Sequence, residues 1–469
     1  MGATNTGNLC EIKERKVSAM KKSMLSVTMA TAMVATTACS GGSKPAETTA
    51  APAAETTAAA AAETTAATEA EVTEPVTIKF ANYALLEAGY DVYWNQLLDE
   101  FKKENPNITV ELVTAPYGEI VNTVINMAGG GDKIDLMYGE MDWIPTMVEA
   151  GLAAPVKDVL SQDLLSDVYP NILNACSIDG EAYGVPMYVS PFFLYYNKDL
   201  FEKAGLDPNT PPTTYEEMLE IAPKLAELKT DDGNQVYPFG LTTASVPVSG
   251  ACLTSSVYNF GGTVLDADGN LAIDDGFKEA VTMWKELHDK GYNPENSKLK
   301  DLRNLFALGQ LAMYYDQSWG FNGVKSINPD AADFIASAAP LKGGNGEGAS
   351  VLQAGTLMVV DNDDARKAAT AKLVDYIMSE EKISQYFEDV TPAYPSRQSM
   401  ENLAVVKDST ILAGAAGSVS NVKPVTFIPT LSDLNLELCT LAQAVTVSGT
   451  DVDTAIANFE KAAKAVIEQ

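Results

Sequence analysis

Short β-favouring runs alternate with amphipathic helices from residue 76 onward. Residues 76–83 ("VTIKFANY"), 108–112 ("ITVEL") and 134–139 ("IDLMYG") favour strands. Between them, residues 94–101 and 120–128 place apolar side chains at the i, i+3, i+4, i+7 spacing of one helical face. The order strand–helix–strand–helix–strand predicts a parallel sheet covered by helices.

Candidate ligand-binding side chains gather where these strands end. Tyr83 closes the first strand, and Glu140, Asp142 and Trp143 follow the third. In open parallel sheets, ligands bind at the carboxyl ends of the strands. We therefore expect these four residues to lie near a ligand-binding cleft.

The second half of the chain repeats this pattern. Residues 190–197 ("SPFFLYYN") read as a strand, and a helix begins after "PPTTYEEM", with Thr213 or Thr214 as its N-cap and an acid three residues later. Pro223 is expected to kink or end that helix. A chain of 469 residues exceeds one ordinary core, and we expect two lobes, each with a sheet dominated by parallel strands.

The stretch "MYYDQSWG" (313–320) places two kinds of chemistry at a strand end. Asp316 stands three residues before Trp319. A sugar stacks its C–H face on an aromatic ring, and its hydroxyls donate hydrogen bonds to carboxylates. We expect Trp319 to be a stacking platform, Asp316 its polar partner, and Gly320 to let the backbone turn away. In the alternative, Trp319 is a core residue and Asp316 caps the next helix.

Charge and residue usage exclude several classes of function. The chain has 63 acidic and 32 basic residues, a formal charge of −31. Nucleic-acid binding needs a basic surface, so we expect no nucleic-acid partner. The chain has only one histidine, His288, which excludes histidine-rich zinc sites. This residue borders an apolar helix face. "DADGN" (266–270) reads as a turn because its ligand spacing is wrong for a calcium loop. We expect no metal and no cofactor.

Cysteine usage points to packing rather than chemistry. Cys176, Cys252 and Cys439 lack C-x-x-C spacing, which argues against a metal or redox site. We expect them in hydrophobic cores. Whether one pair among them forms a disulfide stays open.

The start of the chain has the pattern of an export signal. Lysines after Met20 precede a short apolar run, and small residues precede Cys39. The segment resembles a bacterial lipoprotein signal, in which the cysteine receives a lipid. We expect Met20 to be the true translation start, residues 1–38 to be an upstream extension plus signal peptide, and residues 39–75 to be a lipidated, low-complexity tether.

Three blocks carry a family resemblance: residues 184–207 ("GVPMYVSPFFLYYNKDLFEKAGLD"), 211–218 ("PPTTYEEM") and 308–320 ("LGQLAMYYDQSWG"). They resemble, in order and spacing, the signature blocks of the family 1 extracellular solute-binding proteins, the substrate receptors of bacterial ABC importers. The likeness extends over roughly residues 76–469. It implies a two-lobed α/β periplasmic-binding-protein fold with an interlobe hinge and a central ligand cleft.

The resemblance also implies the division of the chain and the ligand contacts. It gives a first lobe of residues 76–189, continued by about 341–398, and a second lobe of residues 190–340, continued by about 399–469. The ligand-binding residues that it implies, together with those at the strand ends, are Tyr83, Glu87, Asp142, Trp143, Tyr188, Ser190, Asp316, Trp319, Tyr394 and Arg397.

The function implied is that of a transport receptor rather than an enzyme. A monomer, anchored by its lipid to the outer face of the cytoplasmic membrane, would bind a carbohydrate, in the first place an oligosaccharide, and deliver it to the permease subunits of an ABC importer. Two alternatives stay open. The solute is a polyamine, a peptide or another small molecule, or the chain is an exported glycosidase, since paired carboxylates and aromatic platforms serve that chemistry as well.

Overall fold

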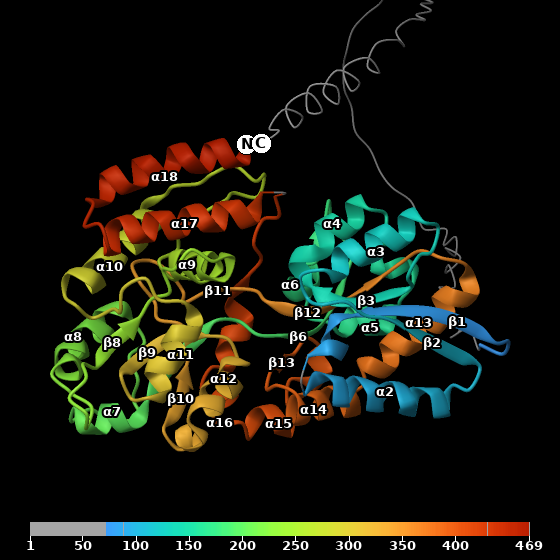
Figure 1. Ribbon diagram of the computed structural model, residues 1–469, viewed down its shortest axis with the longest axis horizontal. Helices are drawn as coiled ribbons and strands as arrows, with labels where there is room; N and C mark the ends of the chain where they lie inside the picture. The colour runs from blue at the N-terminus through green and yellow to red at the C-terminus, as the bar shows by residue number, and fades with distance from the viewer. Residues whose placement is uncertain (1–71, 88, 429, 469) are drawn as a thin grey trace, which may run out of the picture. The chain divides into compact units, whose positions relative to one another are not determined.

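The computed structural model describes residues 72–87, 89–428 and 430–468 (Figure 1). The signal segment, Met20 and Cys39 lie outside the described residues. Two main sheets, one of six strands and one of four, lie within the unit formed by residues 65–469.

The six-stranded sheet is built from segments that are far apart in the sequence. Its strand order is β13-β6-β12-β3-β1-β2. The strands are β1 (Val76–Asn82), β2 (Ile108–Val113), β3 (Leu136–Glu140), β6 (Val185–Val189), β12 (Ala354–Val359) and β13 (Tyr394–Pro395). The β1 strand pairs in parallel with β2 and β3, which confirms the predicted parallel unit.

The four-stranded sheet has the order β10-β7-β9-β8. Its strands are β7 (Phe193–Asn197), β8 (Tyr237–Gly240), β9 (Leu311–Asp316) and β10 (Ile335–Ala338). Only β8 and β9 pair in parallel. The expectation of mainly parallel sheets was wrong for both, because β6, β12 and β13 in the six-stranded sheet and β7 and β10 in this one run antiparallel to their neighbours.

Helices cover both sheets. Those near the six-stranded sheet include α2 (Tyr90–Glu104), α3 (Ile120–Gly129), α13 (Asp364–Ile377) and α14 (Glu380–Asp389). The α2 helix buries Trp94, Leu97 and Phe101, as the apolar spacing predicts. The α13 helix packs on β1 and α2, so that orange and blue segments lie side by side in Figure 1.

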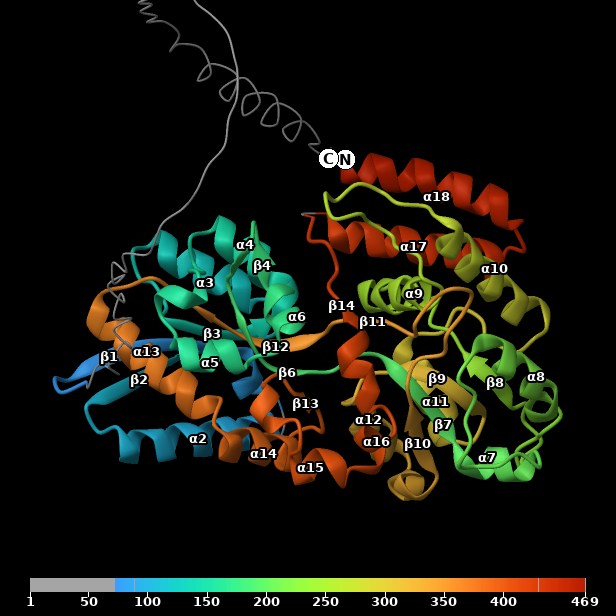
Figure 2. The ribbon, with the colours of Figure 1, turned by 180° about the vertical axis from the view of Figure 1, so that it is seen from behind.

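A separate group of helices packs together beside the four-stranded sheet (Figures 1 and 2). It consists of α9 (Pro247–Asn259), α10 (Asp275–Asp289), α17 (Leu431–Thr446) and α18 (Val452–Ile467). The α8 helix (Tyr215–Ala226) packs on β8, and α11 (Leu299–Ala307) packs on β9.

The remaining elements are short. They are α4 (Ile144–Glu149), α5 (Gln162–Asp167), α6 (Pro170–Asn174), α7 (Lys198–Lys203), α12 (Gly320–Ile327), α15 (Ala404–Lys407), α16 (Thr410–Ala413), β4 (Ser177–Ile178), β5 (Glu181–Ala182), β11 (Ser350–Val351) and β14 (Val422–Lys423), together with 3-10 turns such as η2 (Tyr83–Leu86).

The start of α8 follows the predicted capping chemistry. Thr214 is the N-cap, and its hydroxyl accepts a hydrogen bond from the Glu217 backbone N–H at 3.1 Å. The Glu217 carboxylate accepts in return from the N–H of Thr213, at 2.7 Å, rather than from the N-cap residue itself. Pro223 does not end the helix, which continues to Ala226.

The chain passes between the two sheets repeatedly: from β6 into β7, from β10 into β12, and again after β13 through α16, which packs on β10. The first two passages are joined at Ser190. Its N–H donates to the Gln353 carbonyl at 2.9 Å, and its hydroxyl lies 2.7 Å from the hydroxyl of Ser318. The positions of the lobe boundaries stay a prediction.

The three cysteines of the described region, Cys176, Cys252 and Cys439, are free and buried. Burial raises the pKa of the Cys176 thiol to about 12. The disulfide left open by the sequence is therefore not formed among them.

Candidate ligand-binding site

A cavity of about 750 Å³ lies where strands of both main sheets end. Two sets of side chains face each other across it. The first wall follows strands of the six-stranded sheet and includes Tyr83, Tyr90, Tyr117, Glu140, Asp142 and Tyr188. The second wall follows β9 and the start of α11 and includes Lys298, Lys300, Arg303, Gln317 and Trp319.

The first wall is built by the neighbouring ends of β1 and β3. These strands pair in parallel, so Tyr83, just after β1, comes next to Glu140, the last residue of β3. The Tyr83 hydroxyl donates a hydrogen bond of 2.9 Å to Glu140 Oε1. The Tyr83 ring also packs edge-on against Tyr117, with 5.0 Å between centroids. The result is an aromatic surface that carries an acceptor.

Glu140 is a half-buried carboxyl with an unusual proton affinity. Burial raises its pKa to about 7, with Asp142 adding to the shift and the Tyr83 hydrogen bond opposing it. Within the described residues, neither Glu140 nor Asp142 forms a salt bridge. Asp142 is exposed and lines the same cavity.

The raised pKa of Glu140 gives a prediction about stability and pH. The folded state holds this proton more tightly than the unfolded chain, so the contribution of Glu140 to stability is full below its ordinary pKa of 4.5 and is lost as the pH rises to about 7. We expect Glu140→Gln to melt increasingly higher than the wild type as the pH is raised from about 5 to 8. Thermal unfolding of both proteins across this range measures it.

A matched control separates Glu140 from a general loss of negative charge. Glu149→Gln removes an exposed carboxylate from α4 and should shift the melting temperature equally at all these pH values. A Glu140→Gln protein whose melting temperature stays parallel to the wild type from pH 5 to 8 would contradict the shifted pKa.

Trp319 lies on the second wall, as the stacking-platform hypothesis requires. It is the N-cap residue of α12, is half-buried, and lines the cavity. Its ring therefore packs on the core with one part and faces the cavity with another. The use of this face for ligand stacking stays a prediction.

Asp316 does not act as predicted. It is fully buried and does not line the cavity. Arg303 donates to it through Nε and Nη2, both at 2.7 Å, and the Tyr314 hydroxyl and Gln317 N–H donate at 3.0 and 2.8 Å. Four donors fill its two oxygens, which leaves no acceptor for a ligand. Nor does it cap α12, whose N-cap is Trp319. Asp316 instead fixes Arg303.

Gly320 serves this ion pair rather than a turn of the backbone. A Cβ atom at this position would lie 2.2 Å from Asp316 Oδ2, closer than any non-bonded contact allows. Only glycine leaves room for the carboxylate that holds Arg303. The sequence "DQSWG" therefore encodes a buried acid and the space for it.

The other predicted residues of the first half are distributed around the cavity. Tyr188 lines it, and its hydroxyl lies 3.1 Å from that of Tyr138. Trp143 is behind the wall, 5.7 Å from the Tyr83 ring. Ser190 is fully buried in the passage between the sheets, and Glu87 is an exposed C-cap after η2; neither lines the cavity.

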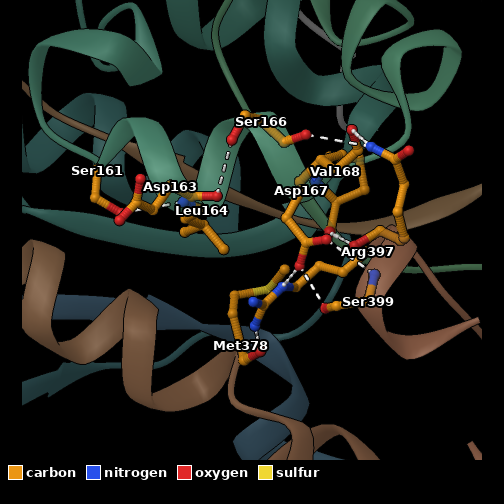
Figure 3. Close-up of polar contacts among 12 residues, drawn as sticks. Ser161, Asp163, Leu164, Ser166, Asp167, Val168, Met378, Arg397 and Ser399 are labelled. Atoms are coloured by element: carbon orange, nitrogen blue, oxygen red, sulfur yellow. Dashed lines mark hydrogen bonds and ion pairs between the residues drawn. The ribbon is translucent and has the colours of Figure 1, made fainter.

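Tyr394 and Arg397 do not line this cavity, and their predicted contact with the ligand stays a prediction. Tyr394 is buried, donates to the Leu412 carbonyl at 2.7 Å, and lines a different cavity of about 680 Å³. Arg397 pairs with Asp167 at 2.7 Å and donates to the Met378 carbonyl at the same distance (Figure 3). Both side chains anchor the loop after β13.

Sequence reasoning missed most of the lining residues, among them Tyr90, Tyr117, Arg303 and Gln317 as well as the two lysines, Lys298 and Lys300. Tyr90 and Tyr117 stand outside any strand end, and Arg303 lies thirteen positions from its partner Asp316, so no spacing rule connects them. Gln317 lies inside the motif "MYYDQSWG". Its position next to Asp316 at a strand end was the one sequence feature that could have identified it as a lining residue.

The described residues show neither a candidate metal site nor a helix suited to cross a membrane. In that part of the chain, no cluster of three or more histidine, cysteine, aspartate or glutamate side chains is arranged to hold a metal ion. Among the helices described, none has the length and apolar character needed to cross a membrane.

Comparison with known proteins gives a consistent result. The family model of the bacterial extracellular solute-binding proteins matches residues 96–414. A binding protein of Brucella abortus is 26% identical over 249 residues, which are 52% of this chain and 59% of that protein, so less than two thirds of its length is matched. The maltodextrin-binding protein of Bacillus subtilis is 21% identical over 357 residues, 74% of this chain and 81% of its own.

Solved structures show the same fold. The cyclic alpha-maltosyl-1,6-maltose binding protein from Arthrobacter globiformis superposes with a TM-score of 0.74 at 21% identity, covering 84% of this chain and 99% of that one. The predicted two-lobed α/β fold is thereby confirmed.

Proposed function

The chain belongs to the bacterial extracellular solute-binding proteins, and we propose that it captures a carbohydrate outside the cytoplasm for an ABC importer. The observation that carries this proposal is the cavity between the two walls. A half-buried tryptophan lines one wall, and a carboxyl group set among tyrosines lines the other.

The cavity has the chemistry that a sugar requires. Trp319 offers a rigid apolar face for the C–H side of a ring. Glu140 and Asp142 offer acceptors for hydroxyl donors, and both lie at the carboxyl end of β3, where ligands of such sheets bind. A volume of about 750 Å³ exceeds the need of one monosaccharide ring, which favours an oligosaccharide.

The names of the relatives favour the same class of ligand. The Bacillus subtilis protein is named for maltodextrin, and the Arthrobacter globiformis protein for a cyclic maltosyl-maltose. Their identity to this chain is low, so they support a carbohydrate in general rather than an α-glucan in particular.

The proposed mechanism is capture by closure. The walls belong to two sheets that are joined through the passages around Ser190 and Gln353. A ligand held by both walls binds the closed form more tightly than the open one and shifts the population toward it. The permease can then distinguish the loaded receptor from the empty one.

The cellular placement is part of the proposal. Export agrees with the extracellular family, and the signal pattern ending at Cys39 supports a lipid anchor at the outer face of the cytoplasmic membrane. A maltooligosaccharide-binding relative from Streptococcus pneumoniae is named as a lipoprotein. We also retain the two predicted lobes, 76–189 with 341–398 and 190–340 with 399–469, and a monomeric receptor.

A thermal-shift screen of the full chain tests the proposal. A ligand at 100 times its Kd stabilises the native state by about 2.7 kcal/mol, which is easily seen as a higher melting temperature. We expect stabilisation by members of a carbohydrate panel and none by polyamines or short peptides. Stabilisation by a polyamine or peptide alone would replace the sugar with that solute.

One observation also suits a glycosidase: a carboxyl with a pKa near 7 lies beside a second carboxyl, as in enzymes that use a general acid. The sugars that stabilise the protein should therefore be incubated with it and analysed. A receptor returns them intact, whereas cleaved products would identify an enzyme.

A further inference from the structure

We propose that the second wall binds a carboxylate of the ligand, so that the captured carbohydrate is acidic and carries a uronic acid. This inference rests on the proposed function, because it names the kind of carbohydrate that the cavity takes. It is carried by the hydrogen-bond donors of Arg303, Gln317, Lys298 and Lys300.

Arg303 presents a fixed and unused donor edge. Its Nε and Nη2 atoms bind Asp316 side-on at 2.7 Å each, which orients the planar guanidinium. No partner of Nη1 is present among the residues that the structure describes. The Nη1–Nη2 edge of a guanidinium matches the two oxygens of a carboxylate. Arg303 also lines the cavity, where such an edge would meet a ligand carboxylate.

Gln317 adds a donor that has no partner in the protein. The residue is only 1% exposed, yet it lines the cavity. In the described structure its amide nitrogen makes no hydrogen bond. An unsatisfied buried amide costs about 1–3 kcal/mol, which a ligand oxygen would recover. A half-turn of the terminal amide exchanges its two polar atoms, so either one can be directed toward the ligand.

Lys298 and Lys300 supply positive charge to the second wall. Lys298 precedes α11 and Lys300 lies in its first turn, one helical turn from Arg303. Both are exposed and line the cavity. Neither forms a salt bridge with another described residue. Asp316 neutralises Arg303, so the lysines leave this wall positive in a chain whose net charge is −31.

The two walls together orient such a ligand. The carboxyl groups of Glu140 and Asp142 lie on the first wall, where they accept from sugar hydroxyls and repel a ligand carboxylate. The second wall offers donors and positive charge. A neutral sugar satisfies the first wall and leaves the lysines without a counter-charge. In a rival explanation of these charges, the ligand is neutral, and the carboxyl groups of the first wall attract the lysines of the second when the cavity closes.

The test compares saccharides that differ only in charge. Di- and trisaccharides that contain galacturonate, glucuronate or mannuronate are titrated into the full chain by calorimetry, each beside its methyl ester. We expect at least one uronate to bind about 10-fold or more tightly than its ester, the minimum for a charge-assisted hydrogen bond. This advantage should shrink as ionic strength rises from about 0.05 to 0.5 M.

Variants locate the effect on the second wall. Lys300→Gln should weaken uronate binding about 2- to 5-fold, as for an exposed charge, and should weaken ester binding less. Gln317→Met should weaken uronate binding more, about 10-fold, without lowering the melting temperature of the empty protein, because its amide nitrogen has no partner to lose. Lys224→Gln is the control. It makes the same change of charge at an exposed position of α8, which packs on the four-stranded sheet, and it should bind like the wild type.

Each alternative outcome is decisive. Neutral sugars that bind as tightly as the uronates would overturn this inference and leave the carbohydrate receptor intact. A sulfated or phosphorylated sugar that outcompetes every uronate would replace the carboxylate with that anion. A chain that binds no saccharide of either series but binds a polyamine or peptide would reject both proposals.

Discussion

Replacing Trp319 with alanine is expected to weaken sugar binding about 30- to 1000-fold while leaving the empty protein nearly as stable as the wild type. A buried aromatic contact of this kind is worth about 2–4 kcal/mol in binding, and each 1.4 kcal/mol is about tenfold in affinity. Trp319 is only half-buried in the empty cavity, so its removal leaves little void in the core. Calorimetric titration and thermal unfolding measure the two effects.

Trp284 provides the matched contrast. It is fully buried in α10, and its indole N–H donates to the Ser256 hydroxyl at 2.9 Å. Trp284→Ala should cost about 3–5 kcal/mol of folding stability. If Trp319→Ala were destabilised to the same extent, Trp319 would be a core residue. If it bound sugar at wild-type strength, the stacking platform would be refuted.

Asp316→Ala should destabilise the protein by about 3–5 kcal/mol, because it leaves the guanidinium of Arg303 largely buried without its counter-charge. This outcome differs from that of a ligand contact, whose loss would lower affinity and spare stability. Chemical denaturation of the empty protein measures the change. The affinity should fall as well, since Arg303 would lose the partner that orients it.

A double variant separates the lost charge balance from lost packing. Asp316→Leu combined with Arg303→Met replaces the ion pair by apolar side chains and should recover most of the stability, since such replacements are often neutral. Asp316→Ala with wild-type stability would mean that solvent already balances the charge of Arg303.

The part of the first wall at the ends of β1 and β3 could be predicted from the sequence because it follows from local rules. Hydrophobic patterning located β1 and β3, and parallel pairing brings their carboxyl ends together. These rules therefore predicted that Tyr83, Glu140 and Asp142 lie close together, and all three line the cavity. Predicting their positions requires only the pairing of β1 with β3 and no contact with other parts of the chain.

The second wall could be predicted only in part, because it depends on a pairing between elements. Trp319 was identified from its motif, whereas Asp316 was taken for a ligand contact. Its true partner, Arg303, comes from the neighbouring helix α11. A sequence shows that an acid stands at a strand end, but not whether a cation from another element already occupies it. The same limit applies to Arg397, whose partner Asp167 lies far away in the chain.

The order of strands has a consequence for how the chain folds after export. The central β12 strand of the six-stranded sheet lies between β3 and β6 but follows the whole four-stranded sheet in the sequence. The β1–β3 unit must therefore wait, with one edge unpaired, until β12 emerges on the far side of the membrane. The four-stranded sheet is contiguous from β7 to β10 and can form earlier. Because long-range pairings form slowly, completion of the six-stranded sheet is expected to set the pace of folding, and its waiting edge to be the place where a newly exported chain is most exposed to aggregation.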